Sequence, residues 1–154
     1  MKKTTQGKLR ELVQAIRLAK KIVVLCSKDP GADTIAGMLT LGHAMNSLGK
    51  DVTLISPDGV PSKLQVLPGS ELIYSERNEI GDLAVWLDRG ADGKLGAAQM
   101  NFEKSKIRIK LSPEDCGCSM TLGELVLPLI RALGVDIDHA LAVCLDSALE
   151  NSTV

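Results

Sequence analysis

Aromatic residues are scarce in this sequence: its 154 residues include one Trp, one Tyr and one Phe. Single-stranded nucleic acids bind surfaces on which several aromatic side chains stack against the bases, so this scarcity argues against such a surface. An excess of positive charge is also missing, because 18 Lys and Arg residues and 19 Asp and Glu residues give a net charge of −1. Any contact with nucleic acid would therefore have to be local.

Long apolar segments are missing too. No apolar run in the sequence reaches the roughly 18 residues that a membrane-spanning helix needs. The segment Met1 to Arg10 is polar and basic, with no apolar stretch behind it, unlike a secretory signal peptide. We therefore expect a soluble, cytoplasmic protein with no membrane partner.

The four cysteines form no recognisable metal-binding pattern. Cys26 and Cys144 lie in apolar segments, where cysteine behaves as a small hydrophobic residue. Cys116 and Cys118 are too close together for a zinc-binding pair, and no second Cys or His pair lies nearby. Reduced thiols in a cytoplasmic protein are the simplest interpretation.

The remaining composition, with 45% hydrophobic and 24% charged residues, is that of a globular protein. A chain of this length suits one domain, spanning residues 1–154. The first helix is indicated by apolar residues spaced three and four apart, namely Leu9, Leu12, Val13, Ile16 and Ala19. Ile22 to Cys26 is continuously apolar, as in a parallel strand covered on both faces. A helix opened by Asp33 and stopped by Gly49 then leads to a strand over Asp51 to Ile55.

The second half of the chain is less regular. Strands are expected over Leu72 to Tyr74 and Leu83 to Leu87. Apolar and polar residues alternate on both sides of a short polar link within residues 98–111, which predicts an antiparallel hairpin. Two helices should close the chain, over residues 120–133 and 138–149. The sequence thus predicts an α/β fold with a mainly parallel, doubly wound sheet flanked by helices and an added antiparallel hairpin.

Two aspartates follow strands at the same edge of the predicted sheet. Asp33 comes soon after the strand that ends at Cys26, and Asp88 directly follows the strand that ends at Leu87. Because open α/β sheets bind ligands at the carboxyl ends of their strands, we expect both side chains to face a common cleft. Asp33 is equally explained as a helix N-cap, and Asp88 as a turn residue. Their shared position favours a functional role for the pair.

The segment Val23 to Gly37 resembles the first motif of the DHH phosphoesterases, in which a strand is followed by His-x-x-Pro-Asp-x-Asp-Ala and a helix. Pro30 and Asp33 match the Pro and the second Asp of that motif. Ser27 stands where the His belongs, and Gly31 stands where the first Asp belongs. The resemblance therefore implies the strand, loop and helix of a metal site, with the His and the first Asp of its motif replaced.

The similarity extends over most of the chain. Asp88 matches the single Asp of the family's second motif. Residues 39–54 resemble the helix and strand that follow the first motif, and residues 116–153 resemble the two closing helices. The nearest branch is the oligoribonuclease and 3′-phosphoadenosine-5′-phosphate phosphatase group. The Asp-His-His motif is absent, since the only histidines are His43 and His139. We expect no counterpart of the family's C-terminal substrate domain.

The resemblance implies an active site with two metal ions, Mn²⁺ or Mg²⁺, which ionise a bridging water and stabilise the leaving oxygen. Only Asp33 and Asp88 carry a carboxylate at the family's ligand positions, and Ser152 falls near the place of a further Asp. Lys28 and Gly31 lie where a phosphate could approach the start of the helix. The sequence therefore identifies no catalytic residue, and we expect that two-metal catalysis has been lost.

The sequence leaves two functions open. The chain could be a binding or scaffold protein for a nucleotide, a short RNA or a protein partner, with a homodimer formed along the edge of the predicted hairpin. Alternatively, it is a divergent metal-dependent phosphoesterase that acts on short oligoribonucleotides or nucleoside phosphates through Asp33 and Asp88. The missing Asp-His-His motif favours the first function, and the two surviving acids support the second.

Overall fold

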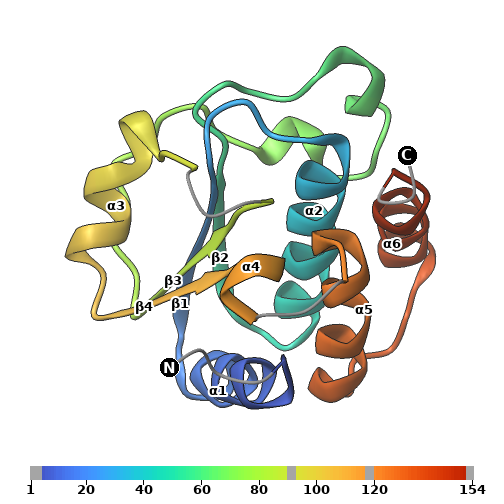
Figure 1. Ribbon diagram of the computed structural model, residues 1–154, viewed down its shortest axis with the longest axis horizontal. Coiled ribbons are helices and arrows are strands. Elements are labelled where there is room, and N and C mark those ends of the chain that lie inside the picture. The colour runs from blue at the N-terminus through green and yellow to red at the C-terminus, as the bar shows by residue number, and fades with distance from the viewer. Residues whose placement is uncertain (1–4, 90–92, 117–119, 152–154) are drawn as a thin grey trace.

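A four-stranded parallel sheet forms the centre of the computed structural model, which describes residues 5–89, 93–116 and 120–151 (Figure 1). In chain order its strands are β1 (Lys21–Cys26), β2 (Asp51–Ile55), β3 (Leu83–Leu87) and β4 (Ile107–Leu111). They lie in the order β2-β1-β3-β4, and all neighbouring pairs are parallel. The chain therefore moves from β1 to one side of the sheet first, and to the other side afterwards.

Helices cover both faces of this sheet (Figure 1). On one face, α2 (Ala32–Ser47), α5 (Leu122–Leu133) and α6 (His139–Asn151) pack against each other, whereas α3 (Gln99–Lys104) packs on β1 and β3 from the other face. Crossovers between parallel strands are right-handed, so connections that run in opposite directions across the sheet place their helices on opposite faces. The other elements are α1 (Thr5–Leu18), α4 (Pro113–Cys116) and the short 3-10 helices η1 (Ser62–Leu64), η2 (Ser70–Leu72) and η3 (Gly96–Ala98).

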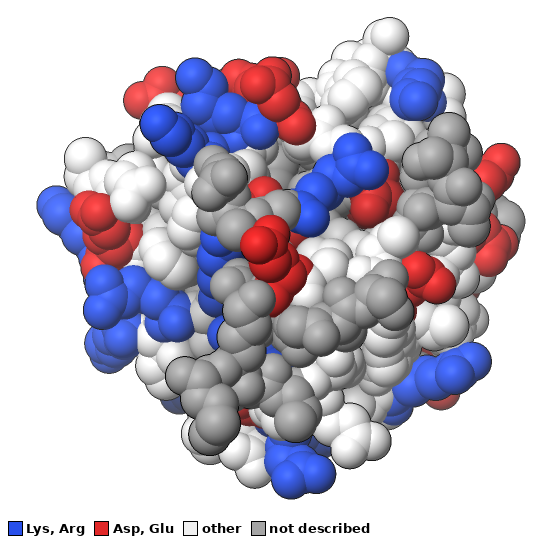
Figure 2. Space-filling view, in the orientation of Figure 1, with Lys and Arg blue, Asp and Glu red and all other residues white. Residues whose placement is uncertain are grey.

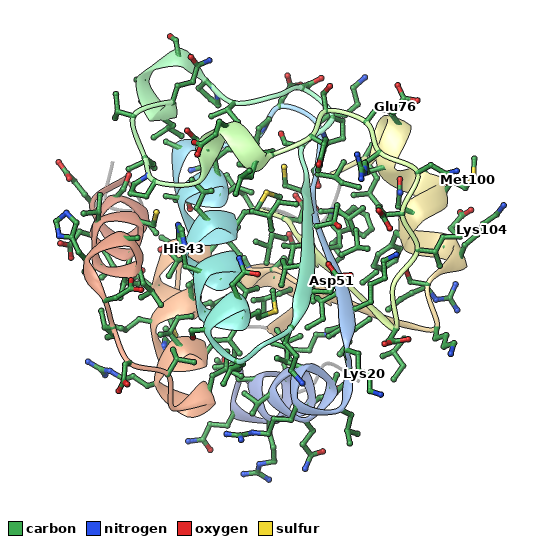
Figure 3. All side chains as sticks on the ribbon, turned by 180° about the vertical axis from the view of Figure 1, so that it is seen from behind. Lys20, His43, Asp51, Glu76, Met100 and Lys104 are labelled. Atoms are coloured by element: carbon green, nitrogen blue, oxygen red, sulfur yellow. The ribbon has the colours of Figure 1, made fainter. Side chains whose placement is uncertain are left out.

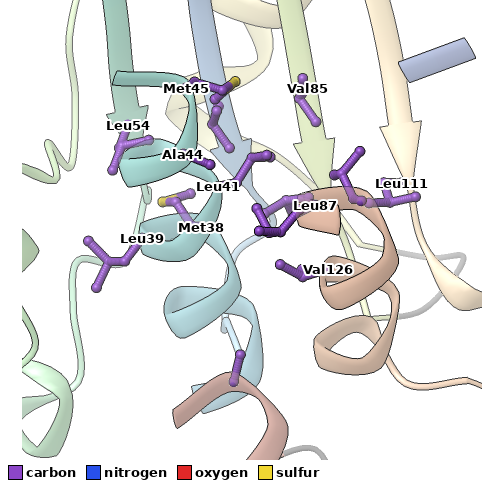
Figure 4. Packing of buried hydrophobic residues seen from close by; sticks show 14 of the residues in the cluster. Met38, Leu39, Leu41, Ala44, Met45, Leu54, Val85, Leu87, Leu111 and Val126 are labelled. Carbon is purple, nitrogen blue, oxygen red and sulfur yellow. The ribbon is translucent and has the colours of Figure 1, made fainter. Parts of the chain in front are cut away.

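Each face of the sheet has its own apolar core. The larger core joins the sheet to α1, α2, α5 and α6, and Figure 4 shows Met38, Leu41 and Val126 within it. The smaller core, on the α3 face, consists of Val23, Leu25, Ile55, Ala84, Leu95 and Ala98, with Trp86 and Phe102 packed against it. Because alternate residues of β1 enter opposite cores, the strand is apolar from Ile22 to Cys26, as its sequence indicates.

Glycines flank both ends of α2, the helix that carries Asp33. Gly49 follows the helix with φ of +79°, a left-handed conformation that glycine adopts readily, so its predicted role in stopping the helix is confirmed. Gly31, not Asp33, is the N-cap, and it makes no side-chain cap hydrogen bond. Asp33 is the second residue of the helix. The structural explanation of Asp33 as an N-cap is therefore wrong, although a carboxylate in the first turn still suits the helix dipole.

The predicted antiparallel hairpin over residues 98–111 is wrong. Its first half forms η3 and α3, and its second half forms β4, which pairs with β3 in parallel. In the helical half, Ala98 and Phe102 face the smaller core, but Met100 is 57% exposed and lies on the outer side of α3 (Figure 3). A parallel partner strand requires a crossover, which α3 supplies. Over so short a segment, a helical period and a strand period fit the same residues.

The predicted strand over residues 72–74 is also not formed. Residues 70–72 are the 3-10 helix η2, and only Tyr74 makes an isolated parallel bridge, to Ile55 at the end of β2. The other three predicted strands are present with bounds that agree within one residue, and the long helices are present with their ends shifted by a few residues. Among the residues that the structure describes, no helix combines the length and apolar character needed to cross a membrane.

Candidate functional site

The candidate site lies at the carboxyl edge of the sheet, between β1 and β3. The strand order reverses here, because β2 lies on one side of β1 and β3 on the other. Open α/β sheets bind their ligands at such a point. Cys26 and Leu87 are register partners at the ends of these strands. The residues that follow them, Ser27 and Asp88, therefore leave the sheet side by side, and both are buried.

Asp88 is held by a lysine from the neighbouring strand. Lys110 Nζ lies 3.4 Å from Asp88 Oδ2, and the exposed fractions of the two side chains are 20% and 7%. The backbone N–H of Gly93 donates to the same oxygen at 3.1 Å. The carboxylate thus has both a counter-ion and a backbone donor from its own chain.

A tryptophan connects this ion pair to the residue after β1. Lys110 Nζ lies 4.4 Å from the centre of the Trp86 ring, in a cation–π contact. The indole N–H of Trp86 donates to Ser27 Oγ at 2.8 Å. Trp86 and Lys110 are register partners on β3 and β4, so the parallel pairing brings them together. Ser27, at the family's His position, is therefore already engaged by a donor.

Asp33 is paired with an arginine. Its side chain is 2% exposed, and Arg89 Nε lies 3.1 Å from Asp33 Oδ1. The Arg89 N–H is not aligned on this oxygen, and Oδ1 has no hydrogen bond from any described residue, so the contact is an ion pair without a directed hydrogen bond. The hydroxyl of Thr34 is likewise buried without a hydrogen-bond partner among the described residues. Buried polar atoms are usually hydrogen-bonded, so these two oxygens mark the site as unusual.

The two acids line separate hollows. Asp33 borders a hollow of about 420 Å³ together with Glu114. Asp88 borders a cavity of about 40 Å³ together with Ser27, and Arg89 lines both spaces. The smaller cavity has room for only a few water molecules. Because consecutive residues at a strand end point to opposite faces, Asp88 and Arg89 separate here. We expected both acids to face a common cleft. Instead, they border different spaces, and Arg89 borders both.

The loop from Ser27 to Gly31 is fixed on both sides. The backbone N–H of Lys28 donates to Lys94 O at 2.7 Å, and the backbone N–H of Asp29 donates to Asp58 Oδ2 at 2.7 Å. Asp29 has φ of +54°, in the left-handed region that residues other than glycine rarely adopt. Such strained residues concentrate at functional sites. The exposed Lys28 borders the smaller cavity.

Gly31, the second residue expected to meet a phosphate, lies under Arg89. A Cβ atom at this position would lie 2.5 Å from Cδ and Nη1 of Arg89, so any other residue at position 31 would require the Arg89 side chain to shift. The Arg89 side chain therefore lies over the start of α2. The structure brings Lys28 and Gly31 to the same edge, and phosphate binding by them stays a prediction.

The described Cys26, Cys144 and His43 side chains have structural roles. Cys26 and Cys144 are buried free thiols, and burial raises the pKa of each to about 11. Both are therefore protonated at neutral pH and poor nucleophiles. His43 Nε2 lies 2.8 Å from Pro68 O and ties α2 to the loop after η1 (Figure 3). The side chains of Cys116 and Cys118, and all of Ser152, lie outside the described residues.

Sequence reasoning placed both acids at this edge but missed their partners. Arg89 directly follows Asp88, in a segment where the sequence predicts a turn. The alternating pattern within residues 98–111 predicts that Lys110 lies on the polar, solvent-facing side of a hairpin. The parallel register that opposes Trp86 and Lys110 is the signal that would have found this second pair.

The described residues do not fit a pair of metal ions. Two-metal sites hold ions about 3.5–4 Å apart and share a water between them, with several ligands on each ion. No group of three or more His, Cys, Asp or Glu side chains within the described part of the chain is placed to hold an ion. The carboxylates at the two retained ligand positions already contact basic side chains.

Comparison with known proteins supports the fold. No family model matches the sequence. The structure is similar to the crystal structure of an exopolyphosphatase-related protein from Bacteroides fragilis, with a TM-score of 0.79 and 24% sequence identity. The match covers 96% of this chain and 50% of that one, so the chain spans about half the length of this neighbour. The chain therefore shares the α/β fold of this neighbour.

Proposed function

We propose that this chain is a phosphoesterase-like domain of the DHH type that has lost two-metal hydrolysis and acts as a binding or scaffold domain. The observation that carries the proposal is the division of the site. Asp33 and Asp88 line different hollows, with Arg89 between them. Two ions that share one nucleophilic water need ligands around a single space.

The replaced ligand positions support the same proposal. Ser27 and Gly31 supply neither the imidazole nor the carboxylate of the family motif, and the Ser27 hydroxyl already accepts from Trp86. The loss of one well-placed electrostatic group typically lowers a rate by about 10²–10³, and several such groups are replaced here. A retained fold without the catalytic set suits a protein that binds its ligand without converting it.

The proposed ligand is a nucleotide or a short RNA bound locally at the carboxyl edge. Figure 2 shows basic and acidic side chains interspersed over one face of the molecule, without a broad basic field among the side chains it describes. This distribution suits a small ligand better than a long nucleic acid. A homodimer is the other proposed partner. The proposed dimer would form along β4, an edge strand of the sheet, where Lys106 and Arg108 are charges of the kind that protect an edge from pairing.

Hydrolysis assays with Mn²⁺ test the proposal. We expect the purified chain to hydrolyse bis-p-nitrophenyl phosphate, a dinucleotide and 3′-phosphoadenosine-5′-phosphate no faster than Mn²⁺ alone. Asp33→Asn and Asp88→Asn should leave this background unchanged, while a labelled dinucleotide should bind equally well with Mn²⁺ or EDTA. Robust turnover that disappears in both variants would contradict the proposal.

A divergent metal-dependent phosphoesterase is the second candidate function. Its specific support is that both retained acids stand at the switch point of the sheet and that Asp33 Oδ1 is buried without a hydrogen bond from the described residues. In that case Asp33 and Asp88 are ligands of Mn²⁺ or Mg²⁺. The same assay separates the two candidates, because this one requires turnover that depends on both carboxylates.

A further inference from the structure

We infer that Arg89 and Lys110 are built-in counter-cations that take over the charge of the metal ions and close this edge to divalent cations. The inference rests on the proposed function and deepens it, since it names what replaced the metals. Each retained acid has its own cation: Arg89 for Asp33 and Lys110 for Asp88. At the replaced ligand positions, Gly31 lies under Arg89, and Ser27 accepts from the Trp86 ring that Lys110 contacts.

The first replacement concerns Gly31 and Arg89. The guanidinium reaches Asp33 by crossing directly over Gly31, where any Cβ would overlap it. An aspartate at position 31, as in the family motif, would therefore require the arginine to shift from this path. The glycine that replaces a metal ligand thus also gives room for the observed position of the cation. Asp33, buried to all but 2%, needs a compensating charge of some kind.

The second replacement concerns Ser27 and Lys110. The Ser27 hydroxyl accepts from the indole N–H of Trp86, and the Trp86 ring lies against Lys110 Nζ. The ring thereby helps to hold the ammonium group 3.4 Å from Asp88 Oδ2. Ser27, Trp86, Lys110 and Asp88 form one chain of contacts across β1, β3 and β4. The residue at the histidine position thus supports the second cation indirectly.

Charge balance explains why a metal ion would be excluded. Each acid contributes one negative charge and each partner one positive charge, so the two pairs are neutral. A divalent cation at either acid would meet the guanidinium or the ammonium at contact distance, where repulsion in a partly buried site is strong. It could bind only if Arg89 or Lys110 moved away, or if that cation were removed.

The decisive experiment removes both cations. In the Arg89→Gln, Lys110→Gln double variant, calorimetry and Mn²⁺ electron paramagnetic resonance should detect saturable Mn²⁺ binding at least about tenfold tighter than in the wild-type chain. Adding Asp33→Asn and Asp88→Asn to this variant should abolish the gain. A folded double variant that binds Mn²⁺ no better than the wild type would overturn the inference and leave the proposed function standing.

A matched control excludes a general effect of net charge. Lys106→Gln, Arg108→Gln removes the same two kinds of charge near the other end of β4, where Lys106 lies 4.0 Å from Asp82 and Arg108 donates to Glu103 O. This variant should bind Mn²⁺ as the wild type does. An equal gain in the control would show that lower net charge, rather than release of Asp33 and Asp88, is responsible, and would overturn the inference.

A measurement on the wild-type chain covers the case in which the double variant does not fold. Millimolar Mn²⁺ should leave the backbone amide signals of Asp33 and Asp88 unbroadened by paramagnetic relaxation, and EDTA should not change the thermal midpoint. Selective broadening of both signals would overturn the inference even without the variant. Mn²⁺-dependent turnover by the wild type, in contrast, would first overturn the proposed function.

Discussion

Acidic side chains have different partners at the two ends of the sheet. At the amino end, Asp82 Oδ2 accepts from the backbone N–H groups of Lys20 and Lys21, each at 3.1 Å, and the exposed Lys106 Nζ lies 4.0 Å from Asp82 Oδ1. At the carboxyl end, Asp33 and Asp88 are buried and each faces a basic side chain. The first arrangement is fixed by the backbone, whereas the second depends on side chains that a single substitution can remove.

This difference distinguishes Asp82, which stabilises the fold, from Asp33 and Asp88, which belong to the candidate site. Backbone N–H groups at the start of a strand are present whatever the sequence, so Asp82 needs no particular partner residue. At the carboxyl edge, Asp88 has one such donor in Gly93, and Asp33 Oδ1 has none among the described residues, so these buried carboxylates also need a compensating charge. Here Arg89 and Lys110 meet that requirement at the carboxyl edge.

Lys110→Met should be the most destabilising of these changes. It keeps the apolar stem but leaves Asp88, 7% exposed, without its cation, and it removes the contact with the Trp86 ring. Breaking a fully buried ion pair costs about 3–5 kcal/mol, and partial exposure of Lys110 lowers our expectation to about 2–3 kcal/mol. Urea unfolding of this variant and of Lys106→Met measures the difference. Equal losses in both variants would contradict the distinction between the two ends of the sheet.

Arg89→Gln should destabilise less, by about 1–2 kcal/mol, because half of the Arg89 side chain is exposed and water can partly replace it. Arg89→Lys keeps the charge and should recover part of the loss. Denaturant unfolding of the three proteins at low and high salt measures both effects, and salt should weaken the difference between wild type and Arg89→Gln. A loss that salt does not change would indicate packing rather than charge.

The same comparison shows how far the sequence specifies this molecule. The β1-α2-β2 unit follows from a continuous apolar run and a helix ended by Gly49, because local patterns and tertiary packing agree there. Residues 98–111 are different, since Ala98 and Phe102 fit both a strand and a helix until the parallel register with β3 is known. The positions of Asp33 and Asp88 follow from the strand ends. Lys110 could not be assigned to Asp88, because that contact exists only in the parallel pairing.

Asp82→Asn should have the smallest effect, and one that depends on pH. Hydrogen bonds from the backbone N–H groups of Lys21 and Lys20 lower the pKa of Asp82 below its usual value. A group whose pKa is lowered in the folded state stabilises the fold above its unfolded pKa, about 3.9 for Asp, and loses this contribution as the pH falls through the folded value. We therefore expect the wild type to exceed Asp82→Asn slightly in stability near neutral pH, with the two converging in acid. Urea midpoints of both proteins measured from pH 7 down to the acid limit of folding test this. A difference that stays constant through the acid range would mean that ionisation of Asp82 contributes nothing, and that the amino end owes its order to packing alone.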